Sequence, residues 1–254
     1  MTKVKISAAI LTFNSEKNIE NVLNKLGWCD EIIIVDSFST DKTLDICANN
    51  SCVIYQKKFE GFGSQKQFLI SKCSNDWVIS IDSDEVLDDL LIKSINELSI
   101  KDFENFSGFL INRKHIFLNR QFIYGKESKA YILRLFNKNK GNVTDNVVHE
   151  SIKVTGIIKQ INGSMLHYTI SDLKDAIQKM DSYAQLKAKE YFTNKKNVTF
   201  IKLYLNYPFT FFKEYFINLN FLNGYEGYIW SNLVAQGSAL KYYYLKELYK
   251  KNVL

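Results

Sequence analysis

Short apolar runs alternate with helix-like segments over the first hundred residues of the chain. The runs are typical of strands buried on both faces of a sheet, and they lie at 6–13, 31–35, 52–55 and 77–81. Apolar residues recur at helical spacing between them, which predicts helices near 15–26, 40–48, 61–73 and 87–98. This alternation predicts an α/β fold with a mostly parallel central sheet and helices on both faces.

The pattern changes after residue 105. Further strands, which extend the sheet, are predicted at 108–117, 131–136, 147–154 and 164–168. From Ser171 the chain becomes helical, first as one long amphipathic helix and then as aromatic-rich helices over 199–250, with a break near Pro208. We therefore expect an α/β domain over 1–170 and a helical C-terminal extension over 171–254.

Composition and charge narrow the class of protein. Hydrophobic residues make up 46 % of the 254 positions and charged residues 24 %, which is typical of a globular chain. The net charge of +6 permits contact with anionic lipid or phosphate, but it does not call for nucleic acid as a partner. The four cysteines form no C-x-x-C pair, and no apolar stretch reaches the roughly 18 residues of a spanning helix. These features favour a cytoplasmic protein without a signal peptide.

Polar side chains follow three of the predicted parallel strands. In chain order they are Thr12, Asn14 and Glu16, then Asp36, then Asp82, Ser83, Asp84 and Glu85. The carboxyl ends of parallel strands share one edge of a sheet, where open α/β sheets bind their ligands. Clustered carboxylates repel one another unless a cation or a proton lies between them. The Asp-x-Asp at 82–84 is therefore a candidate for holding Mg²⁺ or Mn²⁺ against a diphosphate.

Two other interpretations of this Asp-x-Asp remain open from the residues alone. It can be a strand exit whose solvated acids begin the next helix. It can also be the motif of an aspartyl phosphatase, because WVISIDSDEV fits four apolar residues followed by D-x-D, with Asp82 as nucleophile. The order of the chain argues against the phosphatase, since a βαβαβα unit precedes the motif.

Taken as a set, the motifs of the first 95 residues resemble glycosyltransferase family 2. The shared elements are T-F-N-x-E after the first strand, V-D-S-x-S-x-D-x-T after the second, and D-x-D-E after the fourth. The resemblance implies a GT-A fold, with a nucleotide-sugar half over 1–100 and an acceptor half over 101–170. It further implies an inverting transfer that depends on a divalent metal.

The resemblance also implies roles for individual residues. The implied donor-binding residues are Thr12, Asn14, Glu16, Asp36, Lys66, Asp82 and Ser83. Asp84 is the implied main metal ligand, with Asp82 and His167 as further candidates. The transfer needs a base on the acceptor hydroxyl, for which Glu150 is the candidate and Asp145 the alternative.

Within the family, the chain is most similar to the lipopolysaccharide-core β-glucosyltransferase branch. The segments that carry this likeness are GFGSQKQ, RLFNKNKG, NVVHE and FLNGYEGYIW. It departs at Gln67, where relatives commonly have asparagine. This likeness implies UDP-glucose as the donor, and a lipid-linked saccharide, such as the inner core of lipopolysaccharide or lipooligosaccharide, as the acceptor.

The aromatic C-terminal third has two interpretations. Its rings and lysines can lie on the inner face of the cytoplasmic membrane, as a lipid-linked acceptor requires, or its helices can simply pack as core or as an interface. We expect the peripheral membrane location. A non-catalytic membrane-binding module that has kept the fold is the remaining alternative to an enzyme. Arg134 lies in a predicted hairpin, where it can contact a phosphate, but it is expected to be solvated.

Overall fold

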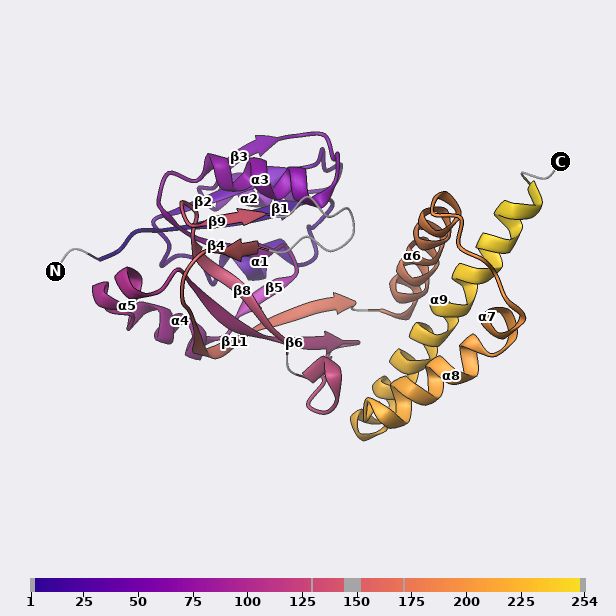
Figure 1. Ribbon diagram of the computed structural model, residues 1–254. Helices are drawn as coiled ribbons and strands as arrows, with labels where there is room; N and C mark the ends of the chain where they lie inside the picture. Colours follow the sequence, from indigo (N-terminus) through magenta and orange to yellow (C-terminus); the bar gives the residue numbers. More distant parts are fainter. Residues whose placement is uncertain (1–2, 129, 144–151, 171, 252–254) are drawn as a thin grey trace. The chain divides into compact units, whose positions relative to one another are not determined.

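The chain folds into two compact units, which Figure 1 colours along the sequence. The computed structural model describes residues 3–128, 130–143, 152–170 and 172–251. Unit 1 comprises Met1–Lys114 and Ala130–Tyr168, and unit 2 comprises His115–Lys129 and Thr169–Leu254. Unit 2 therefore takes in 115–129, a segment that the sequence pattern places within the domain over 1–170.

The first part of unit 1 is a parallel sheet interleaved with helices. Its strands, in the spatial order β3-β2-β1-β4, are β1 (Ile6–Thr12), β2 (Glu31–Asp36), β3 (Val53–Gln56) and β4 (Trp77–Asp82). The helices that connect them are α1 (Ile19–Leu23), α2 (Thr43–Asn49) and α3 (Phe62–Lys72). Ala8 of β1 packs in one apolar cluster with Val22 of α1, while Ala9 packs in another with Leu69 of α3. Both faces of β1 are thus buried, which explains its continuous apolar sequence.

The middle of the chain extends this sheet with further strands, as predicted. They are β5 (Glu85–Leu87), β6 (Gly108–Phe117), β7 (Arg120–Gln121), β8 (Ala130–Asn137) and β11 (Ile158–Ile170). Over the described residues the sheet has nine strands in the order β3-β2-β1-β4-β8-β6-β11-β5, with β7 paired to β6. A separate pair joins β9 (Gly141–Val143) to β10 (Ile152–Val154), so the described part of the strand predicted over 147–154 does not extend the main sheet. The main sheet is mixed: β1–β4 pair in parallel, and β8 is antiparallel to both of its neighbours, β4 and β6.

The predicted helix over 87–98 begins later than expected. Residues 85–87 form β5, which pairs with β11, and helix α4 (Asp89–Asn96) starts only after it. Asp88 caps this helix by accepting a hydrogen bond from the backbone N–H of Leu91 over 2.8 Å. Helix α5 (Ile100–Asn105) follows and begins with a capping box between Ser99 and Asp102. The turn 82–85 therefore connects two strands, β4 and β5, and does not lead directly into a helix.

Unit 2 is mostly helical. Its helices are η1 (Lys126–Ser128), α6 (Leu173–Thr193), α7 (Phe200–Tyr204), α8 (Asn206–Phe212), η2 (Lys213–Ile217), η3 (Asn220–Asn223) and α9 (Gly224–Lys251). The predicted break near Pro208 is confirmed, because α7 ends at Tyr204 and a new helix begins at Asn206. None of the helices in the described part of the chain is long and apolar enough to span a membrane.

One buried asparagine explains why 115–129 belongs to unit 2. The side chain of Asn223 accepts hydrogen bonds from the backbone N–H groups of Ile123 and Tyr124, each over 3.2 Å, and donates one to the Tyr124 carbonyl. Phe117 and Phe122 from the same segment pack edge-on against Trp230 of α9. The segment is thus fastened to the helical extension by both hydrogen bonds and aromatic packing.

Candidate active site

The carboxyl ends of β1 and β2 are joined by a buried hydrogen bond. Thr12 and Asp36 lie opposite each other in the parallel register, and the Thr12 hydroxyl donates to Asp36 Oδ1 over 2.9 Å. Asp36 Oδ2 accepts from the backbone N–H of Ser39 over 2.8 Å. Both side chains are buried. Asp36 therefore shapes the loop that leaves β2, and its expected contact with the donor stays a prediction.

Asn14 and Glu16 fasten the loops that leave β1 and β2. Asn14 has a left-handed backbone, with φ of 47°, and its side-chain oxygen accepts from the Thr40 N–H over 2.8 Å. Glu16 accepts from the Lys42 N–H over 3.1 Å, at the start of α2. Both residues are exposed at the carboxyl edge of the parallel strands. The same contacts that fix these loops keep them beside the ends of the strands, where a ligand is expected.

Arg134 of β8 connects the two ends of the turn between β4 and β5. Its Nη2 donates to Asp82 Oδ2 over 2.7 Å and to Glu85 Oε1 over 2.6 Å. The backbone N–H of Asp82 also donates to Glu85 Oε2 over 3.1 Å. Lys66 of α3 brings its Nζ to 3.6 Å from Asp82 Oδ1, and Arg113 of β6 brings its Nη1 to 4.0 Å from Glu85 Oε1.

Three members of this cluster are buried, and Asp82 is partly exposed. Glu85 is 0 % exposed, Arg134 5 % and Lys66 7 %, whereas the side chain of Asp82 is 35 % exposed. Burial alone would raise the pKa of Asp82, but the charges of Arg134 and Lys66 outweigh it and hold that pKa well below its usual range. Burial acts in the opposite sense on Arg134, and the two carboxylates outweigh it and raise the pKa of the guanidinium. Both shifts favour the charged forms of Asp82 and Arg134, which pair with each other.

Arg134 is the residue of this site whose environment is predicted wrongly from the sequence. It is expected to be solvated in a hairpin, and it is instead buried between two carboxylates. An arginine is seldom enclosed unless it is paired. Arg134 lies where the pairing of β8 with β6 shifts, since Leu133 pairs with Leu110 and Leu135 with Phe109, and such a bulge cannot be recognised from the alternation of residues in the sequence.

Asp84 and His167 meet on the outer side of the same turn. Nε2 of His167 lies 3.4 Å from Asp84 Oδ1, and the Asp84 carbonyl accepts from the Tyr168 N–H over 2.8 Å. The Asp84 side chain is 26 % exposed and the His167 side chain 18 %, so both are open to a ligand. Ser83, between the two aspartates, accepts a hydrogen bond from the Ser15 hydroxyl over 2.9 Å.

A divalent cation fits this pair when a ligand completes its coordination. The described residues contain no group of three side chains of the metal-binding types His, Cys, Asp and Glu. Mg²⁺ commonly binds through one or two carboxylates, with waters and substrate phosphates filling the other positions. Asp84, with His167 beside it, offers such a partial set. Asp82 is less suited to ligate a metal, because its two oxygens face Arg134 and Lys66.

The two candidate bases cannot be placed at this site. Glu150 and Asp145 lie in 144–151, outside the residues that the structure describes.

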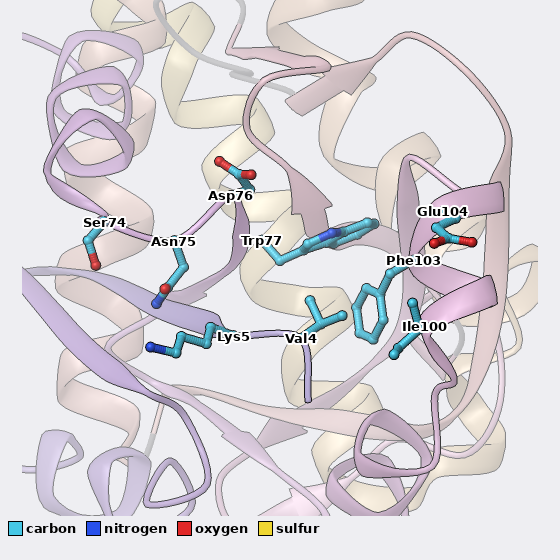
Figure 2. A pocket seen from close by; sticks show the side chains of 9 residues that line it. All are labelled: Val4, Lys5, Ser74, Asn75, Asp76, Trp77, Ile100, Phe103 and Glu104. Carbon is cyan, nitrogen blue, oxygen red and sulfur yellow. The ribbon is translucent and has the colours of Figure 1, made fainter. Parts of the chain in front are cut away.

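A hollow of about 440 Å³ in unit 1 is a separate feature, shown in Figure 2. It lies at the amino ends of β1 and β4, opposite the candidate site, and its lining residues are Val4, Lys5, Ser74, Asn75, Asp76, Trp77, Ile100, Phe103 and Glu104.

Unit 1 is thus an α/β domain that presents a charged turn at the carboxyl edge of its parallel strands. The model of the family "Glycosyl transferase family 2" matches residues 7–163, and the chain belongs to this family. The predicted family and its α/β fold are confirmed. The alternative of an aspartyl phosphatase is set aside, and the pairing of Asp82 with two cations also makes it a poor nucleophile.

Relatives of similar length support this assignment. The chain is 30 % identical over 234 residues to the lipopolysaccharide core biosynthesis glycosyltransferase LpsC of Rhizobium meliloti, covering 89 % of this chain and 86 % of the relative. It is 29 % identical over 257 residues to a glycosyltransferase of Rickettsia bellii, covering 96 % and 87 %. A weak structural likeness is to glucosyl-3-phosphoglycerate synthase of Mycobacterium tuberculosis, with a TM-score of 0.36 and 23 % identity over 44 % of each chain.

Proposed function

We propose that this glycosyltransferase moves glucose from UDP-glucose, with inversion, onto a lipid-linked saccharide such as the inner core of lipopolysaccharide or lipooligosaccharide. The observation that carries the proposal is the pair formed by Asp84 and His167. Asp84 lies on the charged turn at the carboxyl edge of the parallel strands, and His167 lies beside it on β11. The name of the relative LpsC supports the class of acceptor.

The donor would lie across the carboxyl ends of β1, β2 and β4. In this proposal Thr12, Asn14, Glu16, Asp36 and Ser83 border the nucleoside. Asp84 and His167 would hold Mg²⁺ or Mn²⁺, which would bind the diphosphate. When bound, the cation neutralises the charge that develops on the leaving diphosphate. Lys66 contributes a fixed positive charge beside Asp82, on the inner side of the same turn.

Inversion requires a single displacement at the anomeric carbon. The acceptor oxygen attacks from the face opposite the diphosphate, forming the new glycosidic bond as the bond to the phosphate oxygen breaks. A base removes the hydroxyl proton in that step, and we assign this role to Glu150, with Asp145 as the alternative. In the sequence both residues lie between β9 and β10.

We further propose that unit 2 places the enzyme on the inner face of the cytoplasmic membrane. Helices α7 and α8 and the turn η2 expose Phe200, Phe209, Phe212 and Ile217 to between 55 % and 71 %. Burial of such rings in the interface is favourable, and nearby lysines add attraction to anionic lipid. Lys241 is a poorer lipid contact than the sequence implies, because it is half-buried and lies over the rings of Tyr191 and Tyr242.

The proposal is tested by supplying UDP-, GDP- and CMP-sugars with a lipooligosaccharide inner core, in Mn²⁺ or in excess chelator. We expect transfer from UDP-glucose, dependent on the metal, with inverted configuration at the anomeric carbon by NMR. Asp84→Asn removes the proposed metal ligand and is expected to abolish transfer. Its matched control is Asp89→Asn, because Asp89 is an aspartate of α4 whose side chain is 88 % exposed. Binding of UDP with metal but without turnover on any acceptor would favour the non-catalytic module instead.

A further inference from the structure

The turn that carries Asp84 is closed on its inner side by one guanidinium group. Nη2 of Arg134 reaches Asp82, the last residue of β4, and Glu85, the first residue of β5. Its two N–H bonds are therefore divided between the two ends of a four-residue turn. The hydrogen bond from the Asp82 N–H to the Glu85 carboxylate closes the same turn a second time.

The outer side of the turn is fixed by a different strand. The Asp84 carbonyl accepts from Tyr168 of β11, and β11 pairs with β5 so that His167 lies opposite Glu85. Asp84 is thus held between an inner anchor on β8 and an outer anchor on β11. Its carboxylate lies beside His167, whereas the carboxylates of Asp82 and Glu85 pair with Arg134.

We propose that Arg134 is a positioning residue for Asp84, which sets the place of that carboxylate without touching the metal or the donor itself. The inference rests on the proposed function for its consequence, because Asp84 is there the metal ligand. Arg134 also explains why the turn can carry three acids so close together. Together with Lys66 and Arg113 it offsets the charges of Asp82 and Glu85, and Asp84 is left to the cation.

Stability alone is a poor explanation for this arrangement. Removing charges from water costs several kcal/mol per ion, and replacing a buried ion pair with apolar side chains is often neutral or stabilising. A network that is costly to bury is better explained by the geometry that it imposes. Residues that orient a metal ligand typically change metal affinity by about 10- to 100-fold when they are altered.

Two variants separate positioning from folding. Arg134→Lys keeps the positive charge, but the shorter side chain can reach only one of the two carboxylates. Arg134→Gln combined with Glu85→Gln removes one charge of each sign, so Asp82 keeps Lys66 as its cation and the charge balance is restored. Arg120→Lys is the matched control, because Arg120 pairs with Glu226 in unit 2, over 2.9 Å.

The first readout needs no nucleotide. Hydrogen exchange of the peptide that covers 82–87 is measured by mass spectrometry in the ligand-free protein, together with the melting temperature. We expect exchange about 10-fold faster in both Arg134 variants than in the wild type and the control, with the melting temperature of the double variant close to that of the wild type. Unchanged exchange at 82–87 would overturn the proposal whether or not the protein is a transferase.

The second readout is the affinity for UDP in the presence of Mn²⁺, measured by calorimetry. We expect it to fall by about 10-fold or more in both variants. If the double variant has both the affinity and the melting temperature of the wild type, Arg134 acts through folding alone. This result would also overturn the proposal. If the wild type binds no UDP, the proposed function fails, while the exchange measurement still decides the role of Arg134.

Discussion

His167 lies with its Nε2 3.4 Å from Oδ1 of Asp84, and the pairing of β11 with β5 brings the two side chains together. Because this contact puts a nitrogen and an oxygen ligand side by side, His167→Ala is expected to weaken Mn²⁺-dependent binding of UDP by about 10-fold. Calorimetry measures the effect, and circular dichroism checks that the fold is kept. Unchanged affinity would remove His167 from the metal site.

The assignment of the base leads to a second prediction. Glu150→Gln keeps the shape of the side chain but loses its basicity, so kcat is expected to fall by about 100-fold or more while UDP binding is retained. Asp145→Asn is the matched variant in the same segment and is expected to stay active. If the effects of the two substitutions are reversed, Asp145 is the base.

The exposed rings of unit 2 give a prediction about lipid. Phe209→Ala with Phe212→Ala removes two rings that are 64 % and 55 % exposed, and partition onto anionic vesicles is expected to fall by about 10-fold. Tyr183→Ala on α6, where the ring is also 64 % exposed, is the control and should bind as the wild type does. Vesicle co-sedimentation measures the partition. A wild type that ignores anionic vesicles at low salt would show that these rings serve another contact.

The capping box of α5 predicts a pH dependence of stability. Hydrogen bonds from Lys159 and Ser99 lower the pKa of Asp102 from 3.8 to about 2. A lowered pKa in the folded state stabilises the protein at pH values above about 4, and this contribution is lost as the pH falls towards 2. Asp102→Asn should therefore lower the melting temperature by about 2–4 °C near neutral pH.

The melting temperatures of Asp102→Asn and the wild type are compared again at low pH. The difference in melting temperature is expected to shrink as the pH is lowered from 4 towards 2, because the carboxylate of the wild type then becomes protonated. A difference that stays constant over this range would mean that the charge of Asp102 adds nothing to the cap.

The parallel strands are the part of the fold that the sequence predicts best. Strands such as β1 are buried on both faces, so an uninterrupted apolar run marks them. Strand β5 is missed because its three residues lie between an acidic turn and the cap at Asp88, and its formation depends on β11, far along the chain. The membership of 115–129 in unit 2 is missed for the same reason, since it depends on contacts with Asn223.

The candidate site is predictable only where a local motif marks it. The Asp-x-Asp identifies Asp82 and Asp84, but it does not tell which acid pairs with arginine and lysine and which lies beside a histidine. That distinction comes from Arg134 on β8 and Lys66 on α3, which pairing and packing of distant segments bring to Asp82. A sequence shows the charges of these residues but not their partners.

The central claim is that Asp84 holds a divalent cation against the diphosphate of the donor. The most direct measurement is calorimetric titration of UDP into the wild type, Asp84→Asn and the control Asp89→Asn, each in Mn²⁺ and in excess chelator. We predict that the wild type and the control bind UDP with Mn²⁺ and lose about 100-fold in affinity without it, whereas Asp84→Asn binds weakly in both conditions. Tight binding of UDP by Asp84→Asn in Mn²⁺, or binding by the wild type that is indifferent to the chelator, would contradict the claim.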